Sequence, residues 1–183
     1  MRSIKSTRLL ACLALLAMVP ASSLAEDPED ELKAAVVLSF LRYGEWGPAL
    51  PSNATLTIGV VGRSSFADVL RRTLDGKLVN DHPVHVVELK NPADPHGCQV
   101  VYFAADKNLD IKAALPTLAL PRVLTIGETR DFLDAGGAVN LFVLDGHMAF
   151  EVSLEALERS GVSISSRLLR FGQIRSRKKG EHA

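Results

Sequence analysis

Apolar residues recur along this chain with two spacings that take turns, and this alternation predicts helices and strands in succession. Between positions 30 and 46 apolar side chains stand three or four residues apart, which places them along one side of a helix. Positions 54–61 are rich in Thr, Ile and Val and end at Gly62, as a buried strand does. Helical spacing returns after Ser64 and Ser65, two residues that can cap a helix.

The same alternation continues to the C-terminal end. Further strands are predicted at 83–89, 99–104, 123–126, 138–144 and 147–152. Further helices are predicted at 111–115, 129–133, 154–159 and 165–171. Between the last two strands, Asp145-Gly146 is a strong signal for a tight antiparallel hairpin.

Strands that alternate with helices favour parallel pairing, because a parallel connection needs a long right-handed crossover. We therefore expect an α/β fold in one domain, with a mostly parallel sheet, one antiparallel hairpin and helices on both faces. No linker, internal repeat or low-complexity tract divides the chain.

The first 25 residues have the order of an export signal. Basic residues stand at Arg2, Lys5 and Arg8, an apolar run covers 9–19, and small residues lead to Ala25. The apolar run is about half of the roughly 20 residues that span a bilayer, so a retained transmembrane helix is the weaker alternative. We expect residues 1–25 to be a signal peptide cleaved after Ala25, and residues 26–183 to form a periplasmic domain with a basic, frayed tail from about 175.

Charge and cysteine content narrow the possible partners. The whole chain has 21 basic and 21 acidic residues, and the export signal removes three basic ones. The remaining net charge of about −3 makes nucleic acid an unsuitable partner, because a basic face must neutralise phosphates. Cys12 leaves with the signal, so Cys98 stands alone and cannot close an internal disulfide. Since Cys98 precedes an apolar run, we expect it to be buried.

The sequence offers little catalytic chemistry. Asp94, His96 and Cys98 alternate, but no second cluster completes a zinc site, and polar loop residues are the favoured interpretation. A nucleophile motif of the Gly-x-Ser-x-Gly type is absent, and no acid, base and nucleophile converge. We therefore expect neither an enzyme nor a bound metal or cofactor.

One candidate ligand crevice lies where two predicted strands end. Backbone amides at a strand-to-helix junction can hold an anion, and crevices of α/β sheets lie at the carboxyl ends of the strands. The candidate residues are Gly62, Arg63, Ser64, Ser65, Gly127 and Thr129. The segment lacks the glycine pattern of a nucleotide loop, so a structural turn is the alternative. A sensor of a small ligand is the function that this crevice would serve.

Three segments together resemble the YfiR family of periplasmic proteins. The first is the opening helix with its Lys-Ala-Ala start and Glu-Trp close, at 32–46, and the second is the cysteine-led strand at 97–103. The third runs from 123–126 through Asp131-Phe132, 136–139 and 150–152 to 164–169.

This resemblance implies a non-catalytic regulator that binds the periplasmic part of an inner-membrane diguanylate cyclase and represses it. Cyclic di-GMP and biofilm formation would then fall, and an outer-membrane lipoprotein would act as the anti-repressor. The resemblance also implies a homodimer. Better-known members have further cysteines that form disulfides, whereas Cys98 alone rules out control by an internal bridge here.

Binding to a protein partner calls for exposed aromatic or apolar anchors. Tyr43, Trp46 and Phe171 are the candidates, because each lies at the end of a predicted helix. The alternative is that these three side chains belong to the core.

Overall fold

The computed structural model describes residues 28–46, 50–51, 53–91, 93–95, 97–118 and 121–176. The expected signal peptide and its cleavage site lie outside the described residues, as do His96 and the end of the basic tail from 177 onward.

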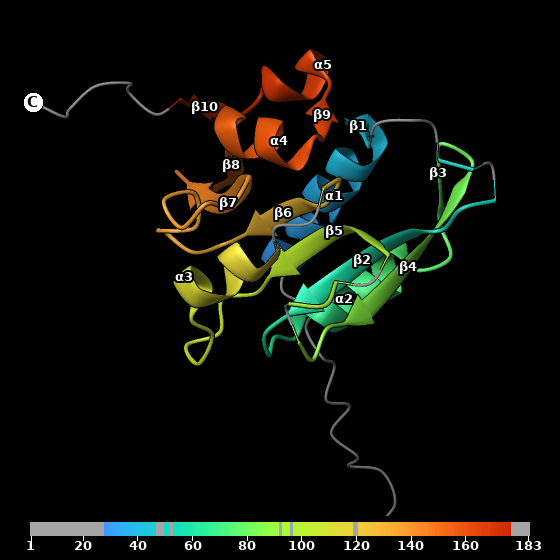
Figure 1. Cartoon of the computed structure of the whole chain (residues 1–183), viewed down its shortest axis with the longest axis horizontal. Helices are drawn as coiled ribbons and strands as arrows, with labels where there is room; N and C mark the ends of the chain where they lie inside the picture. Colours follow the sequence, from blue (N-terminus) through green and yellow to red (C-terminus); the bar gives the residue numbers. More distant parts are fainter. Residues whose placement is uncertain are drawn as a thin grey trace, which may run out of the picture.

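An eight-stranded sheet forms the centre of the molecule (Figure 1), in the order β10-β8-β7-β6-β5-β2-β4-β3. Its strands are β2 (Leu56–Val61), β3 (Leu78–Val79), β4 (His82–Glu88), β5 (Cys98–Phe103), β6 (Leu124–Gly127), β7 (Val139–Leu144), β8 (His147–Ser153) and β10 (Gln173–Arg175). A separate antiparallel pair joins β1 (Gly44–Glu45) to β9 (Ser163–Ile164). The helices are α1 (Pro28–Tyr43), α2 (Phe66–Leu74), α3 (Ile111–Ala114) with the 3-10 turn η1 (Leu115–Leu118), α4 (Leu154–Ser160) and α5 (Ser166–Leu169).

The predicted fold class is confirmed. Strands β4, β2, β5, β6 and β7 pair in parallel, and β7 turns back into β8 as an antiparallel hairpin at Asp145-Gly146. The short strand β3 adds a second hairpin, which the sequence pattern did not predict. Its turn places Asn80 and Asp81 at φ 49° and 67°, a left-handed conformation that Asn and Asp tolerate better than other side chains.

Helices cover both faces of this sheet and create two cores. Residues of α1, α2, α4 and α5 pack on one face, and α3, η1 and residues 132–133 pack on the other. Strand β5 serves both, since Tyr102 faces the first core and Phe103 the second. The Tyr102 ring lies 4.6 Å from that of Phe66, and the Phe103 ring lies 5.5 Å from that of Phe132.

An extra residue in β5 sets this alternation. Thr57 pairs with Cys98 and Ile58 with Val100, so Gln99 has no counterpart on β2. Its side-chain Oε1 accepts a 2.7 Å hydrogen bond from the Thr57 amide. Its backbone carbonyl accepts a 2.9 Å hydrogen bond from the indole Nε1 of Trp46. The polar groups of the bulge are thus used to attach β2 and the end of α1.

The predicted helix at 129–133 is wrong. Residues 130–135 form successive turns, and these turns insert the fully buried Phe132 ring between two glycines. A Cβ at Gly127 would lie 2.4 Å from Phe132 Cδ2, and one at Gly137 would lie 2.2 Å from Cε1. A continuous helix gives way because the core requires the ring at this place, and the glycines leave room for it.

The C-terminal region also differs from its prediction. The helix expected at 165–171 is reduced to α5, and the chain then forms the unpredicted strand β10 at the edge of the sheet. β10 pairs in parallel with β8, with Ile174 opposite Val152.

Gly137→Ala should lower the free energy of unfolding by about 2 kcal/mol, because the added methyl group collides with the Phe132 ring. Urea unfolding of Gly137→Ala, Phe132→Leu and the double variant measures the coupling between the two positions. In the Phe132→Leu background the same substitution should cost at least 1 kcal/mol less. Equal costs in both backgrounds would contradict the proposed packing.

Candidate functional site

The candidate crevice lies at the topological switch point of the sheet. The chain passes from β2 to β4 on one side and then crosses to β5 on the other, so the loops after β2 and β5 diverge at this edge. The segment that follows β6 meets the same edge. Hydrogen bonds link the loops that follow β2, β5 and β6, because Asp106 accepts from the Arg63 amide and Glu128 accepts from the Ala105 amide.

Side-chain carboxylates accept hydrogen bonds from backbone amides of these loops. Asp106 Oδ2 accepts a hydrogen bond from the Arg63 amide at 2.9 Å, and Oδ1 accepts one from the Asn108 amide, also at 2.9 Å. These backbone hydrogen bonds lower the pKa of Asp106. Glu128 Oε1 accepts a hydrogen bond from the Ala105 amide at 2.8 Å. The protein's own side chains thus take the place that an anionic ligand would need at these amides.

The remaining crevice residues have structural contacts as well. Ser64 Oγ accepts a 3.1 Å hydrogen bond from the Phe66 amide, whereas Ser65 makes no side-chain cap bond. Gly62 has φ +95°, and a Cβ there would lie 3.1 Å from Asp106 Cβ. Gly127 leaves room for Phe132, and the Thr129 carbonyl accepts a hydrogen bond from the Phe132 amide. Each of these contacts supports the turn alternative.

Glu128 also joins this edge to α1 through Lys33. The Lys33 ammonium lies 2.8 Å from Glu128 Oε2, 3.0 Å from Glu29 Oε1 and 3.3 Å from Asp30 Oδ1. The side chains of Lys33, Asp30 and Glu128 are only 14%, 12% and 10% exposed. We call this group, Glu29, Asp30, Lys33 and Glu128, the Lys33 cluster.

Electrostatics keep Lys33 charged. Burial alone lowers the pKa of Lys33, but hydrogen bonds and the charges of Glu128 and Glu29 outweigh burial and raise it above its ordinary value. The same surroundings act on the fully buried Tyr102, whose pKa is raised by burial and then by the charge of Glu128. Its hydroxyl meets no hydrogen-bond partner of good geometry among the described residues.

Cys98 is buried, as predicted, and burial raises the pKa of its thiol to about 11. A neutral thiol of this kind is a poor nucleophile at physiological pH. Among the described residues, no group of three or more His, Cys, Asp or Glu side chains is placed to hold a metal ion.

The three aromatic candidates lie in different surroundings. Trp46 is 7% exposed and its indole is bonded to Gln99, so the core interpretation describes it. Tyr43 is 38% exposed and Phe171 is 69% exposed. The pairing of β1 with β9, and a 2.9 Å hydrogen bond from the Ser165 amide to the Tyr43 carbonyl, place the end of α1 beside the start of α5.

Elements α4, α5, β9 and β10 lie together at one end of the molecule (Figure 1), and Phe171 stands in the chain between α5 and β10. Leu154 and Ile174 are 37% and 46% exposed. Next to Leu154 a groove of about 440 Å³ is lined by Leu154, Leu157, Glu158, Gly161, Val162, Ser163, Ile164 and Leu169. We call this groove, together with Phe171 and Ile174, the C-terminal surface.

Comparison with known proteins identifies the family. The sequence model of the YfiR/HmsC-like family matches residues 30–173, which covers most of the chain. This chain belongs to the YfiR/HmsC-like family. The resemblance found in the three sequence segments is thereby confirmed. Members of this family are periplasmic, generally non-catalytic regulators of diguanylate cyclase signalling.

A solved structure supports the fold. The crystal structure of a conserved domain protein from Vibrio cholerae O1 biovar El Tor str. N16961 superposes with a TM-score of 0.51 at 12% identity. The match covers 81% of this YfiR/HmsC-like chain and 60% of the Vibrio chain, so this chain spans under two thirds of the length of the other. Within the described residues, no helix of this family member has the length and apolar character needed to cross a bilayer.

Sequence reasoning missed Asp106 and Glu128. A signal was present, because each carboxylate follows a predicted strand by two residues, at 99–104 and 123–126. Only the backbone amides and hydroxyl groups of these loops were considered, as donors to an anionic ligand.

Lys33→Met should destabilise the protein by about 3 kcal/mol, because Glu128 and Asp30 would remain buried without a counter-charge. Lys112→Met is the matched control, since its 3.9 Å pair with Asp131 is exposed and should contribute less than about 0.5 kcal/mol. Because the pKa of Lys33 is raised on folding, the stabilisation is complete below pH 10.5 and is lost only as the pH rises through the folded value. Urea unfolding at pH 7 compares the variants, and equal stabilities would contradict a supporting role for the cluster.

Proposed function

We propose that this protein binds the periplasmic part of an inner-membrane diguanylate cyclase and represses it, which lowers cyclic di-GMP and biofilm formation. The observation that carries the proposal is the C-terminal surface. It comprises an apolar groove lined by Leu169 and, two residues further along the chain, the exposed aromatic ring of Phe171, in a protein of a family of diguanylate cyclase regulators.

The composition of this surface suits a protein partner. Phe171 is 69% exposed and the Arg170 guanidinium lies 4.8 Å from its ring centroid. Aromatic and Arg side chains are enriched among the residues that dominate binding energy at interfaces. The groove beside Leu154 offers an apolar recess for a side chain of the partner. Tyr43, exposed at the end of α1, extends the candidate interface toward β1.

Strand β10 adds a second means of attachment. It is the last strand of the sheet, and all three of its residues are exposed. An edge strand can pair with an extended segment of another chain through backbone hydrogen bonds. A partner that lies on Phe171 and Ile174 would therefore reach this edge as well.

The proposal includes two further partners implied by the family resemblance. An outer-membrane lipoprotein would act as the anti-repressor by sequestering this protein from the cyclase. A second copy of the chain would form a homodimer. Binding of the lipoprotein to the C-terminal surface would exclude the cyclase and relieve repression.

The alternative function is that of a periplasmic sensor for a small ligand. The crevice at Gly62–Ser65, Gly127 and Thr129 is a weak location for an anion, because Asp106 and Glu128 already accept from nearby amides. A separate cavity on the other side of α4 gives this alternative better support.

Deletion of the gene should raise cellular cyclic di-GMP, and restoration of the full chain should lower it again. A chain without residues 1–25 should fail to restore repression, because it would not reach the periplasm. Quantification of cyclic di-GMP by mass spectrometry in the three strains tests this. Unchanged levels after deletion would overturn the proposal.

Phe171→Ser should derepress the cyclase and weaken binding to its periplasmic part at least tenfold. Because the ring is exposed, the free energy of unfolding should change by less than about 0.5 kcal/mol. Leu78→Ser is the matched control, since Leu78 is also 69% exposed but lies on β3 at the opposite edge of the sheet. If both variants repress equally well, the C-terminal surface is not the binding site.

A further inference from the structure

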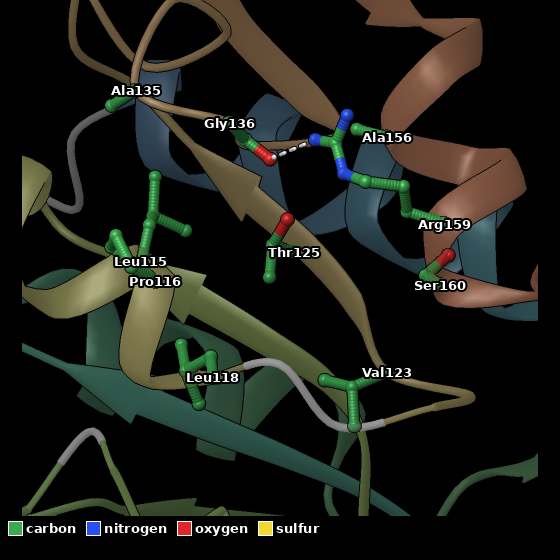
Figure 2. A pocket seen from close by; sticks show the side chains of 10 residues that line it. All are labelled: Leu115, Pro116, Leu118, Val123, Thr125, Ala135, Gly136, Ala156, Arg159 and Ser160. Carbon is green, nitrogen blue, oxygen red and sulfur yellow. Dashed lines mark hydrogen bonds between the residues drawn. The ribbon is translucent and has the colours of Figure 1, made fainter.

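A second cavity lies between η1, β6 and α4, on the side of α4 away from the C-terminal groove. Its volume is about 420 Å³, and Figure 2 shows the side chains that surround it. It is lined by Leu115, Pro116, Leu118, Val123, Thr125, Ala135, Gly136, Ala156, Arg159 and Ser160. This volume lies within the range of roughly 300–1,000 Å³ that is typical of small-molecule sites.

The walls of the cavity are aliphatic. Leu115, Leu118, Val123 and Ala156 are each less than 8% exposed, and they belong to the cores of the fold. Such walls favour an apolar body and disfavour a sugar or other highly hydroxylated ligand, whose polar groups would lose hydrogen bonds to water.

One charged residue lines the cavity, and it is a cation. Arg159 extends from α4 across the opening toward Gly136, as Figure 2 shows, and its Nη2 donates a 3.3 Å hydrogen bond to the Gly136 carbonyl. A guanidinium has five N–H donors, so most remain for a ligand. Among the described residues, no carboxylate forms an ion pair with Arg159.

Two hydroxyls complete the polar part of the lining. Thr125 Oγ1 accepts a 2.9 Å hydrogen bond from the Ala138 amide, which leaves its own proton free to donate. Ser160 Oγ already donates to the Leu157 carbonyl at 2.8 Å and accepts from the Val162 amide at 3.3 Å. The cavity therefore combines apolar walls with one guanidinium and one hydroxyl donor.

We propose that this cavity binds an apolar monocarboxylate. The carboxylate pairs with Arg159, a geometry in which the planar guanidinium can offer two parallel N–H donors, and the apolar body lies against Leu115, Leu118 and Val123. A single guanidinium balances a single negative charge, so a carboxylate suits the site better than a doubly charged phosphate.

The site shares α4 with the C-terminal surface. Ala156, Arg159 and Ser160 line the cavity, while Leu154, Leu157 and Glu158 line the groove. A ligand held by Arg159 therefore contacts the same helix that the partner would contact. This coupling rests on the proposed function, whereas the binding itself does not.

Octanoate is a suitable probe, with octanamide as the uncharged ligand of the same shape. Octanoate, titrated below its micelle concentration into the purified 26–183 protein, should raise the melting temperature saturably. It should bind at least tenfold more tightly than octanamide by isothermal titration calorimetry. Equal affinity for the two ligands, or no saturable binding, would overturn the proposal.

Arg159→Gln should abolish the preference for octanoate over octanamide, because the glutamine side chain is uncharged. Arg167→Gln, which removes an exposed arginine on α5 outside the cavity, should retain the preference. Circular dichroism confirms that both variants fold. A preference that survives in Arg159→Gln would overturn the role of Arg159.

Methyl NMR locates the ligand independently of these variants. Octanoate should shift the methyl signals of Leu115, Leu118 and Val123. If Leu154 and Leu169 in the C-terminal groove shift instead, the assigned cavity is wrong. All these measurements use the purified protein without a cyclase, so their failure is distinguishable from a failure of the proposed repression.

Discussion

The bulge at Gln99 is the constraint on which the two cores depend. Side chains alternate strictly along a strand, so one residue more or fewer before Val100 would exchange the faces of all that follow. Tyr102 would then leave Phe66, and Phe103 would leave Phe132. The extra residue is held because its side-chain and backbone carbonyl oxygens accept hydrogen bonds, from Thr57 on β2 and from the indole of Trp46. A single irregular position thereby fixes which helices can cover which face.

At the carboxyl ends of the strands, the protein places its own carboxylates where many α/β proteins place a ligand. Asp106 and Glu128 satisfy the loop amides, and Glu128 also pairs with Lys33 of α1. This edge of the sheet, where the topology would allow a ligand to bind, instead holds α1 to the sheet through the ion pair between Lys33 and Glu128. Three exposed apolar side chains, Leu154, Phe171 and Ile174, lie at or next to α4, α5 and β10, and both recesses adjoin α4. This distribution fits a protein that acts through contacts with partners.

Sequence periodicity predicted those parts of the fold that local pattern determines. The strands at β2, β4 and β5 and the Asp145-Gly146 hairpin carry their signals within a few residues, so they were predicted correctly. The prediction of a helix at 129–133 was wrong because the Phe132 ring packs against Gly127 and Gly137. The spacing of apolar residues along the sequence gives no information about such a contact. The pairs β1–β9 and β3–β4 are two residues long, too short for any period to show.

The features of the candidate site likewise differ in whether local sequence could predict them. Burial of Cys98 follows from the apolar run after it, so the sequence could predict it, whereas the sequence left open whether Phe171 is exposed or buried. The roles of Asp106 and Glu128 depend on which loops meet at the switch point, and Trp46 depends on a bulge. Arg159 is an exposed residue of a short helix. Its position at the cavity, with a hydrogen bond to the Gly136 carbonyl, is seen only in the three-dimensional structure. These arrangements arise from tertiary structure and leave no local pattern.

The two-residue pairing of β1 with β9 has a consequence for the order of folding. Gly44 lies opposite Ile164, so the first helix of the described chain is fastened by one of the last elements. Contacts between residues so distant in sequence carry a large loop-closure entropy and form late. Until residues 163–164 are available, the end of α1 can be attached through Trp46 and Gln99 but lacks its β-strand partner. We therefore expect the pairing of β1 with β9 to form after the contacts between neighbouring strands of the sheet.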